Sequence, residues 1–149
     1  MKKNHDDVSI LLVEDDDIDA RAVKRGLSRL KLGNPLYRAK NGVEAFNLLQ
    51  TVGLIKDPYI ILLDLNMPIM GGLEFLNKVR KNAIFRSAVI FVLTTSSADE
   101  DLVAAYQENV AGYIVKSDVK DGFENVFNML EHYWDVVTLP TTGNYQVAD

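Results

Sequence analysis

Residues 59–68, Tyr-Ile-Ile-Leu-Leu-Asp-Leu-Asn-Met-Pro, decide the fold of this chain. Five apolar residues in succession lead directly into Asp64 and then into a turn around Asn66 and Pro68. A run without alternating polar residues is typical of a strand that is covered on both faces, as in a parallel sheet between two layers of helices. Asp64 then lies at the carboxyl end of a strand, where open α/β sheets bind their ligands.

Four further apolar segments alternate with helix-like segments on either side of this stretch. We predict strands over 8–13, 36–39, 59–63, 88–93 and 112–115. Strands that alternate with helices through such short connections imply right-handed crossovers. The sequence therefore predicts an α/β fold with a doubly wound five-stranded parallel sheet and helices on both faces.

Polar residues mark where the helices begin and end. Asp16 or Asp17 can cap the first helix, and Gly33, followed by Pro35, ends it. The predicted capping boxes are Asn41 with Glu44 and Ser97 with Glu100. The residues expected to face the core are Ile18, Ala22, Val23, Leu27 and Leu30 in the first helix and Leu73, Leu76 and Val79 in the third.

Composition and charge limit the classes of function. A chain of 149 residues suits a single domain over 1–149, and we expect a core over about 8–138 with flexible ends at 1–7 and 140–149. A net charge of −5 with scattered cations argues against nucleic-acid binding. Without cysteine there is no thiolate chemistry, and no apolar run is long enough to cross a membrane. The N-terminus shows no signal pattern, so the expected compartment is the cytoplasm.

Chemically competent side chains follow four of the five predicted strands. The first strand ends at Glu14 and Asp15, the third at Asp64, the fourth at Thr94 and the fifth at Lys116. The second strand ends in nothing comparable, which fits a place at the edge of the sheet. Three carboxylates that converge on one pocket repel each other unless a cation lies among them.

The nature of these groups predicts which cation binds and what chemistry it serves. A ligand set made only of oxygen atoms favours Mg²⁺, which binds through a few carboxylates, waters and phosphate oxygens. The turn after Asp64 can direct the backbone carbonyl of Asn66 toward the same ion. Thr94 adds a hydroxyl donor and Lys116 adds an ammonium group. Together with a carboxylate nucleophile, these parts suit phosphoryl transfer.

A calcium loop is a weaker interpretation of the acids in the first connection. Asp15, Asp17 and Asp19 have the spacing of the first EF-hand ligands, but Ala20 and Gly26 stand where that loop needs glycine and glutamate. We expect the acids after Asp15 to form only a solvated helix start, where negative charge is favourable.

Two other functions would use a similar fold. A phosphohydrolase with an aspartyl-phosphate intermediate needs a second aspartate two residues after its nucleophile, usually on the first strand. Here Asn66 fills that place, and the strand is the third. A flavodoxin-like cofactor carrier needs a loop of serine, threonine and glycine after the first strand, where the acids of this chain would repel a phosphate.

Four motifs resemble the receiver domain of two-component response regulators. They are Leu11-Leu-Val-Glu-Asp15, Ile61-Leu-Leu-Asp-Leu-Asn-Met-Pro68, Val92-Leu-Thr94 and Gly112-Tyr-Ile-Val-Lys116. The resemblance covers about residues 8–130, with the motifs in the family's order. It implies a flavodoxin-like fold with strand order 2-1-3-4-5 and a phosphorylation-dependent switch in a phosphorelay. It also implies that the chain is no enzyme beyond phosphorylation and dephosphorylation of itself at Asp64.

The resemblance assigns a role to each residue at the strand ends. The implied phosphoacceptor is Asp64, and the implied Mg²⁺ ligands are Glu14, Asp15, Asp64 and the backbone carbonyl of Asn66. Thr94 would move toward the phosphoryl group and Lys116 would pair with it. Tyr113 would be an aromatic switch that swings inward when Thr94 moves. A receiver that only binds partners would lack an acid, the threonine or the lysine, and this chain has all of them.

Length and local sequence also resemble one subfamily. The step from Asp15 to Asp64 is 64 − 15 = 49 residues, slightly longer than usual, and the ending from Tyr133-Trp134 to Leu139-Pro140 is distinctive. These features resemble the small response regulators that are paired with bacterial phytochromes and have no output module. The implied partner is therefore a sensor histidine kinase of the phytochrome type.

The residue after Lys116 departs from the family pattern. Receivers usually have a proline there, often after a cis bond, whereas this chain has Ser117. A cis bond before a residue other than proline costs about 2.5–4 kcal/mol. We therefore expect a trans bond, with Lys116 still facing the site.

The last predicted helix has two apolar rows. The first row is Phe123, Phe127, Leu130, Trp134 and Val137, and the second is Val126, Met129, Tyr133 and Val136. One row suffices to cover a face of the sheet. The second row is either a thicker core contact or a two-fold homodimer interface, for which Tyr133, Trp134 and Val137 are the candidate residues.

Overall fold

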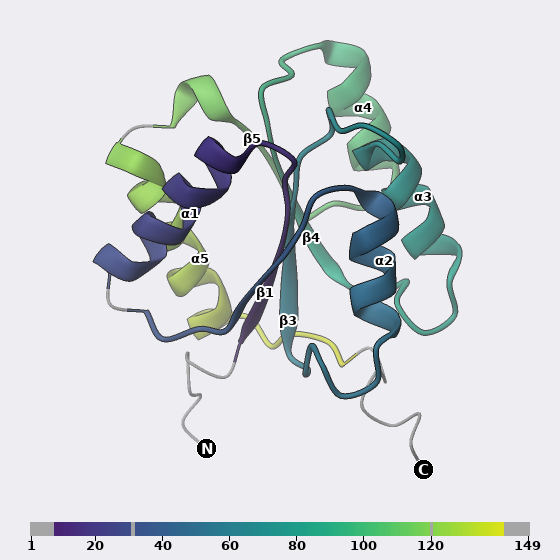
Figure 1. Cartoon of the computed structure of the whole chain (residues 1–149), viewed down its shortest axis with the longest axis horizontal. Coiled ribbons are helices and arrows are strands. Elements are labelled where there is room, and N and C mark those ends of the chain that lie inside the picture. Colours follow the sequence, from purple (N-terminus) through teal and green to yellow (C-terminus); the bar gives the residue numbers. More distant parts are fainter. Residues whose placement is uncertain (1–7, 31, 120, 142–149) are drawn as a thin grey trace.

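In the described part of the chain, five parallel strands form one sheet in the order β2-β1-β3-β4-β5 (Figure 1). The strands are β1 (Ser9–Val13), β2 (Leu36–Ala39), β3 (Tyr59–Leu63), β4 (Val89–Thr94) and β5 (Gly112–Val115). The computed structural model describes residues 8–30, 32–119 and 121–141. The predicted fold class, strand number and strand order are confirmed, and β4 starts one residue later than predicted and includes Thr94.

Two layers of helices cover the sheet. The helices are α1 (Asp17–Arg29), α2 (Gly42–Gln50), α3 (Gly72–Lys81), α4 (Asp99–Gln107) and α5 (Glu124–Val136), with short 3₁₀ turns η2 (Lys116–Asp118) and η3 (Asp121–Phe123). Figure 1 shows α1 and α5 on one face and α2, α3 and α4 on the other. None of the helices in the described ranges is both long enough and apolar enough to span a membrane.

The strand residues divide between two cores because successive side chains point to opposite faces. Ile10 and Leu12 of β1 pack in the core beneath α1 and α5. Leu11 and Val13 pack in the core beneath α2 and α3. All four are almost completely buried, which explains the unbroken apolar pattern of the strand.

The helix starts agree only in part with the prediction. Asp16 caps α1, because its side chain accepts hydrogen bonds from the amides of Ile18 and Asp19. Asn41 caps α2 and accepts from the Glu44 amide at 3.0 Å. The Glu44 carboxylate accepts a hydrogen bond from the backbone amide of Lys40 rather than from that of Asn41. This capping box is therefore shifted by one residue.

The capping box predicted at Ser97 is wrong. Helix α4 begins at Asp99 after Ala98, with no side-chain cap. The hydroxyl of Ser96 donates to the Asp101 carboxylate at 2.6 Å and accepts from the Ala98 amide at 3.3 Å. Because Ser96 already binds both groups, the segment before Asp99 stays extended instead of turning into a helix at Ser97.

The boundaries of α1 and its inward face also differ from expectation. The helix ends at Arg29 with Leu30 as its C-cap, earlier than Gly33. Val23 and Leu27 are buried as predicted, but Ile18 is 68% exposed. Ile18 lies in the first turn of α1, beyond the end of β1, where no strand residue remains for it to cover.

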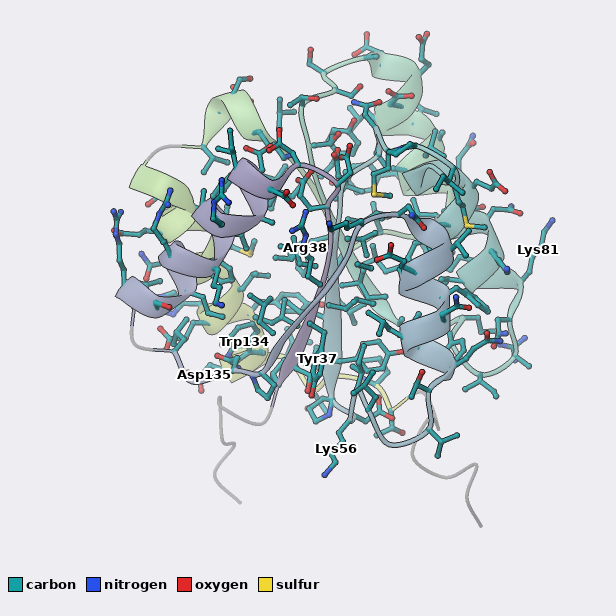
Figure 2. The ribbon with its side chains drawn as sticks, viewed as in Figure 1. Tyr37, Arg38, Lys56, Lys81, Trp134 and Asp135 are labelled. Atoms are coloured by element: carbon teal, nitrogen blue, oxygen red, sulfur yellow. The ribbon has the colours of Figure 1, made fainter. Side chains whose placement is uncertain are left out.

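Helix α5 places Trp134 in the core, which corrects its assignment to a dimer interface. Trp134 is 2% exposed and packs in the same core as Phe127 and Leu130 (Figure 2). Tyr133 is half-buried and makes an edge-on ring contact with Phe91, with centroids 5.2 Å apart. The exposed apolar residues of this region are Met129, Val136 and Val137.

Candidate functional site

Three acids meet at the carboxyl edge of the sheet, as the sequence predicts. Glu14 and Asp15 follow β1, Asp64 follows β3, and their carboxylate oxygens lie within 4.8 Å of one another. Glu14 and Asp64 are buried, whereas Asp15 is exposed. A cluster that offers only oxygen ligands, open to solvent on one side, fits a hard divalent cation that keeps part of its water shell.

Burial and neighbouring charge control the ionisation of Glu14. Its Oε1 accepts from the Lys116 Nζ at 2.5 Å, and its Oε2 accepts from the Asp16 amide at 3.2 Å. Burial raises the pKa of Glu14 from 4.5 to about 7, and the negative charge of Asp64 adds to this, against the opposing effect of Lys116. Burial thus disfavours the ionised form of Glu14, and a cation bound among the acids would favour it.

Asp64 lies at the centre of the site and both of its oxygens face polar groups. The Thr94 hydroxyl donates to Oδ1 at 2.8 Å, and the Asn66 amide donates to the same atom at 3.3 Å. The Lys116 Nζ lies 3.9 Å from Oδ2. Gly72 lets α3 begin directly behind this loop, since a Cβ there would lie 2.5 Å from the carbonyl oxygen of Asp64.

Lys116 reaches the site from the end of β5. Its side chain is only 9% exposed, and its ammonium group contacts Glu14 and Asp19 more closely than Asp64. Burial alone would lower the pKa of Lys116, but the hydrogen bonds to Asp19 and Glu14 raise it, so the ammonium stays charged. The bond to Ser117 is trans, as expected, and the only cis bond in the described residues is Asp57–Pro58.

Two residues of the site were missed by sequence reasoning. Asp19, expected to be solvated, is half-buried and its Oδ2 accepts from the Lys116 Nζ at 2.7 Å. Arg38, at the end of the strand that seemed to contribute nothing, donates to the backbone carbonyls of Glu14 and Asp15. No local pattern identified either residue, because Asp19 is one of several acids at the start of α1 and Arg38 binds backbone carbonyls.

Tyr113 is tied to the loop that follows Thr94. It pairs with Val92 in the sheet, and its hydroxyl donates to the Ser96 carbonyl at 3.0 Å. Partial burial raises its pKa above the ordinary value of 10, so the hydroxyl keeps its proton. The Tyr113 hydroxyl is thus bound to the backbone two residues after Thr94.

Comparison with known proteins gives a consistent result. A family model described as the response regulator receiver domain matches residues 10–127. Response regulator Rcp1 of Synechocystis sp. is 36% identical over 135 residues, which cover 88% of this chain and 92% of Rcp1.

Solved structures agree with the comparison of sequences. The Mn²⁺-bound form of response regulator Rcp1 is similar with a TM-score of 0.75 and 34% identity, over 90% of this chain and 99% of that one. The phosphorylated cyanobacterial phytochrome response regulator RcpA is similar with a TM-score of 0.76 and 28% identity, over 89% of this chain and 98% of that one.

Proposed function

This chain belongs to the response regulator receiver domain family, and from that premise we propose that Asp64 is the residue on which it takes up a phosphoryl group. Receiver domains are signalling switches in two-component phosphorelays, not enzymes in the ordinary sense, and they act with sensor histidine kinases. The proposed self-phosphorylation and self-dephosphorylation at Asp64 are the only chemistry assigned to this chain.

One observation carries the assignment of Asp64. Of the acids at the sheet edge, it is the one that contacts Thr94 and lies near Lys116 while also sharing the acid cluster with Glu14 and Asp15. In the proposed reaction an Asp64 carboxylate oxygen attacks the phosphorus of a phosphohistidine. The P–O bond forms as the P–N bond breaks, and the imidazole leaves with the bonding electron pair and takes up a proton.

The protein's own residues then hold the charge of the phosphoryl group. Lys116 would move the short distance from Glu14 and Asp19 to a phosphoryl oxygen, because its ammonium already lies 3.9 Å from Oδ2 of Asp64. Thr94 would turn its hydroxyl from Asp64 to another phosphoryl oxygen. This rotation of Thr94 would shift the loop whose Ser96 carbonyl binds the Tyr113 hydroxyl, so Tyr113 is the proposed switch residue.

The proposed metal is Mg²⁺, held by Glu14, Asp15, Asp64 and the backbone carbonyl of Asn66. The cluster of three carboxylates, which offers only oxygen ligands, supports this proposal, and the similar Rcp1 has been solved in an Mn²⁺-bound form. Such an ion neutralises phosphoryl oxygens during transfer.

The proposed partners are a bacterial phytochrome kinase and a second copy of this chain. Similar structures include phytochrome response regulators, which supports the first. For the second, the corrected surface is Met129, Tyr133, Val136 and Val137, without Trp134. We further propose a single domain over 1–149 with a core over about 8–138, and the flexible ends expected at 1–7 and 140–149 stay a prediction. Residues 1–7 and 142–149 lie outside the described residues, and the cytoplasmic location stays a prediction.

The proposal is tested by the mass of the intact protein after incubation with acetyl phosphate and Mg²⁺. Wild type and the exposed-acid control Asp99→Asn should gain one phosphoryl group, and Asp64→Asn should gain none. Glu14→Gln combined with Asp15→Asn, and wild type in EDTA, should gain little. Phosphorylation of the Asp64→Asn protein to the wild-type level would reject the assignment, and full phosphorylation in EDTA would reject the role of the metal.

A further inference from the structure

Arg38 binds the backbone of both acids that follow β1. Its Nε and Nη2 donate to the Glu14 carbonyl at 3.1 and 3.0 Å, and Nη2 also donates to the Asp15 carbonyl at 3.2 Å. Its Nη1 lies 2.8 Å from Oδ1 of Asp17, at the start of α1. One guanidinium group on β2, an edge strand of the sheet, thus contacts Glu14, Asp15 and Asp17. Arg38 is labelled in Figure 2.

These contacts continue the sheet beyond the end of its ladder. The parallel register of β1 and β2 ends with Val13 opposite Ala39, and the Glu14 amide still donates to the Ala39 carbonyl at 2.9 Å. After Ala39 the chain turns into α2, with Asn41 as its cap. The guanidinium therefore acts in place of the next main-chain donor, and its planar fork can serve two carbonyls at once.

The contacts fix the direction in which the acids point. With its amide and carbonyl both held to β2, Glu14 has a fixed backbone, and its buried side chain extends to Lys116 on the site side. Among the described hydrogen bonds, the exposed Asp15 side chain makes none to a neighbouring side chain. The hydrogen bond from Arg38 to the Asp15 carbonyl therefore fixes the position of Asp15 near Asp64.

Asp17 offsets the charge of Arg38. Oδ1 of Asp17 lies 2.8 Å from Nη1 of Arg38, so the two side chains form an ion pair. The ion pair leaves Arg38 with little net charge to repel a cation bound nearby. Arg38 can then fix the geometry of the acids without weakening their attraction for a cation.

We propose that Arg38 is a positioning residue for the metal site, holding Glu14 and Asp15 in the arrangement that binds a divalent cation. The proposal rests on the metal site of the proposed function. If Arg38 acted only through its positive charge, its removal would strengthen cation binding, because a repelling group would be gone. A positioning role predicts the opposite sign.

The test is the affinity of the whole, metal-free protein for Mn²⁺, measured from the electron paramagnetic resonance signal of free Mn²⁺. Residues that orient metal ligands from outside typically contribute about 10–100-fold in affinity. We expect Arg38→Gln and Arg38→Lys each to bind Mn²⁺ about tenfold or more weakly than wild type. Arg38→Lys keeps the charge and can keep the ion pair with Asp17, but it lacks the fork that reaches both carbonyls.

Arg21→Gln is the matched control. Arg21 is exposed, borders the same pocket as Arg38 and places a positive charge near the same Asp17. Among the described hydrogen bonds, it makes none to the Glu14 and Asp15 carbonyls. Its loss should leave the affinity unchanged or raise it by less than about twofold, because solvent screens its charge.

Each outcome decides the proposal. Affinity in Arg38→Lys or Arg38→Gln equal to or above that of wild type would overturn the positioning role while the metal site stands. Failure of wild type to bind Mn²⁺ more tightly than Asp64→Asn would overturn the metal site and this inference together. Thermal unfolding in EDTA monitors the fold, and loss of the folded state in both Arg38 variants would show a purely structural role and also overturn the proposal.

Discussion

Replacing Glu14 with glutamine should make the metal-free protein more stable, although it removes a buried ion pair. Glu14 is 1% exposed, shares its site with Asp15 and Asp64, and pairs with Lys116 as its one cationic partner among the described residues. The fold therefore holds this carboxylate in an environment that favours its neutral form. Glutamine has the same shape and carries no charge.

The raised pKa sets the size of the effect. A pKa of about 7 in place of 4.5 means that the folded state disfavours the ionised Glu14 by about 3 kcal/mol above pH 7. This value already contains the favourable effect of Lys116. Glutamine has one acceptor oxygen where Glu14 uses two, so with that oxygen facing Lys116 the hydrogen bond from the Asp16 amide is lost, at a cost of about 1 kcal/mol. The net gain is about 2 kcal/mol, or roughly 4–8 °C in the unfolding midpoint.

The pH dependence identifies the cause of the gain. Because the pKa of Glu14 is higher in the folded than in the unfolded state, its contribution to wild-type stability is fully present below about pH 4.5. That contribution is lost as the pH rises through about 7. The advantage of Glu14→Gln should therefore appear at pH 8 and vanish at pH 5.

Thermal unfolding followed by circular dichroism, in EDTA at both pH values, measures this difference. Glu100→Gln, which removes an exposed acid from α4, is the control and should show no comparable pH-dependent gain. A Glu14→Gln protein that is less stable than wild type at pH 8, or equally favoured at pH 5, would refute the reasoning. Adding Mg²⁺ should reverse the order, because only wild type then gains binding energy.

Three further predictions concern the switch, the core and the surface. Thr94→Val should lower the free energy of unfolding by about 1–3 kcal/mol in chemical denaturation, since it leaves Asp64 without its 2.8 Å donor, whereas Thr95→Val, at an exposed position, should change it little. Trp134→Ala should cost about 3–5 kcal/mol by calorimetry because the ring is buried, and an unchanged stability would return Trp134 to the surface. Val136→Asp, at a position that is 79% exposed, should leave the monomer stable and weaken dimerisation in sedimentation experiments, and a strictly monomeric wild type would end the dimer proposal.

The strands and the site at their ends could be predicted because both depend on local pattern. Unbroken apolar runs identify doubly covered strands, and the carboxyl ends of parallel strands bring Glu14, Asp15, Asp64 and Lys116 to one edge. The order of the strands came from the resemblance to receiver domains. Thr94 follows by the same logic. These features can be predicted from the pattern of apolar residues along the chain and from the geometry of a parallel sheet.

The remaining features depend on three-dimensional contacts that no local pattern specifies. Trp134 and Val136 lie two residues apart in one apolar stripe, yet one is buried and the other exposed, because the angle at which α5 packs decides how wide a stripe the core covers. Asp19 could not be distinguished from the other helix-start acids until the position of Lys116 was known. Arg38 acts through backbone carbonyls, which carry no signature in the side-chain sequence.

The most direct test of the central claim is to locate the phosphoryl group within the chain. After incubation with acetyl phosphate and Mg²⁺, borohydride reduces an aspartyl phosphate to homoserine, which marks the phosphorylated residue permanently. Peptide mass spectrometry should then find homoserine at position 64 in wild type, and at no position when Mg²⁺ is omitted. Homoserine at position 14, 15 or 19 in place of 64, or an unreduced phosphoryl group on a serine or threonine, would contradict the account.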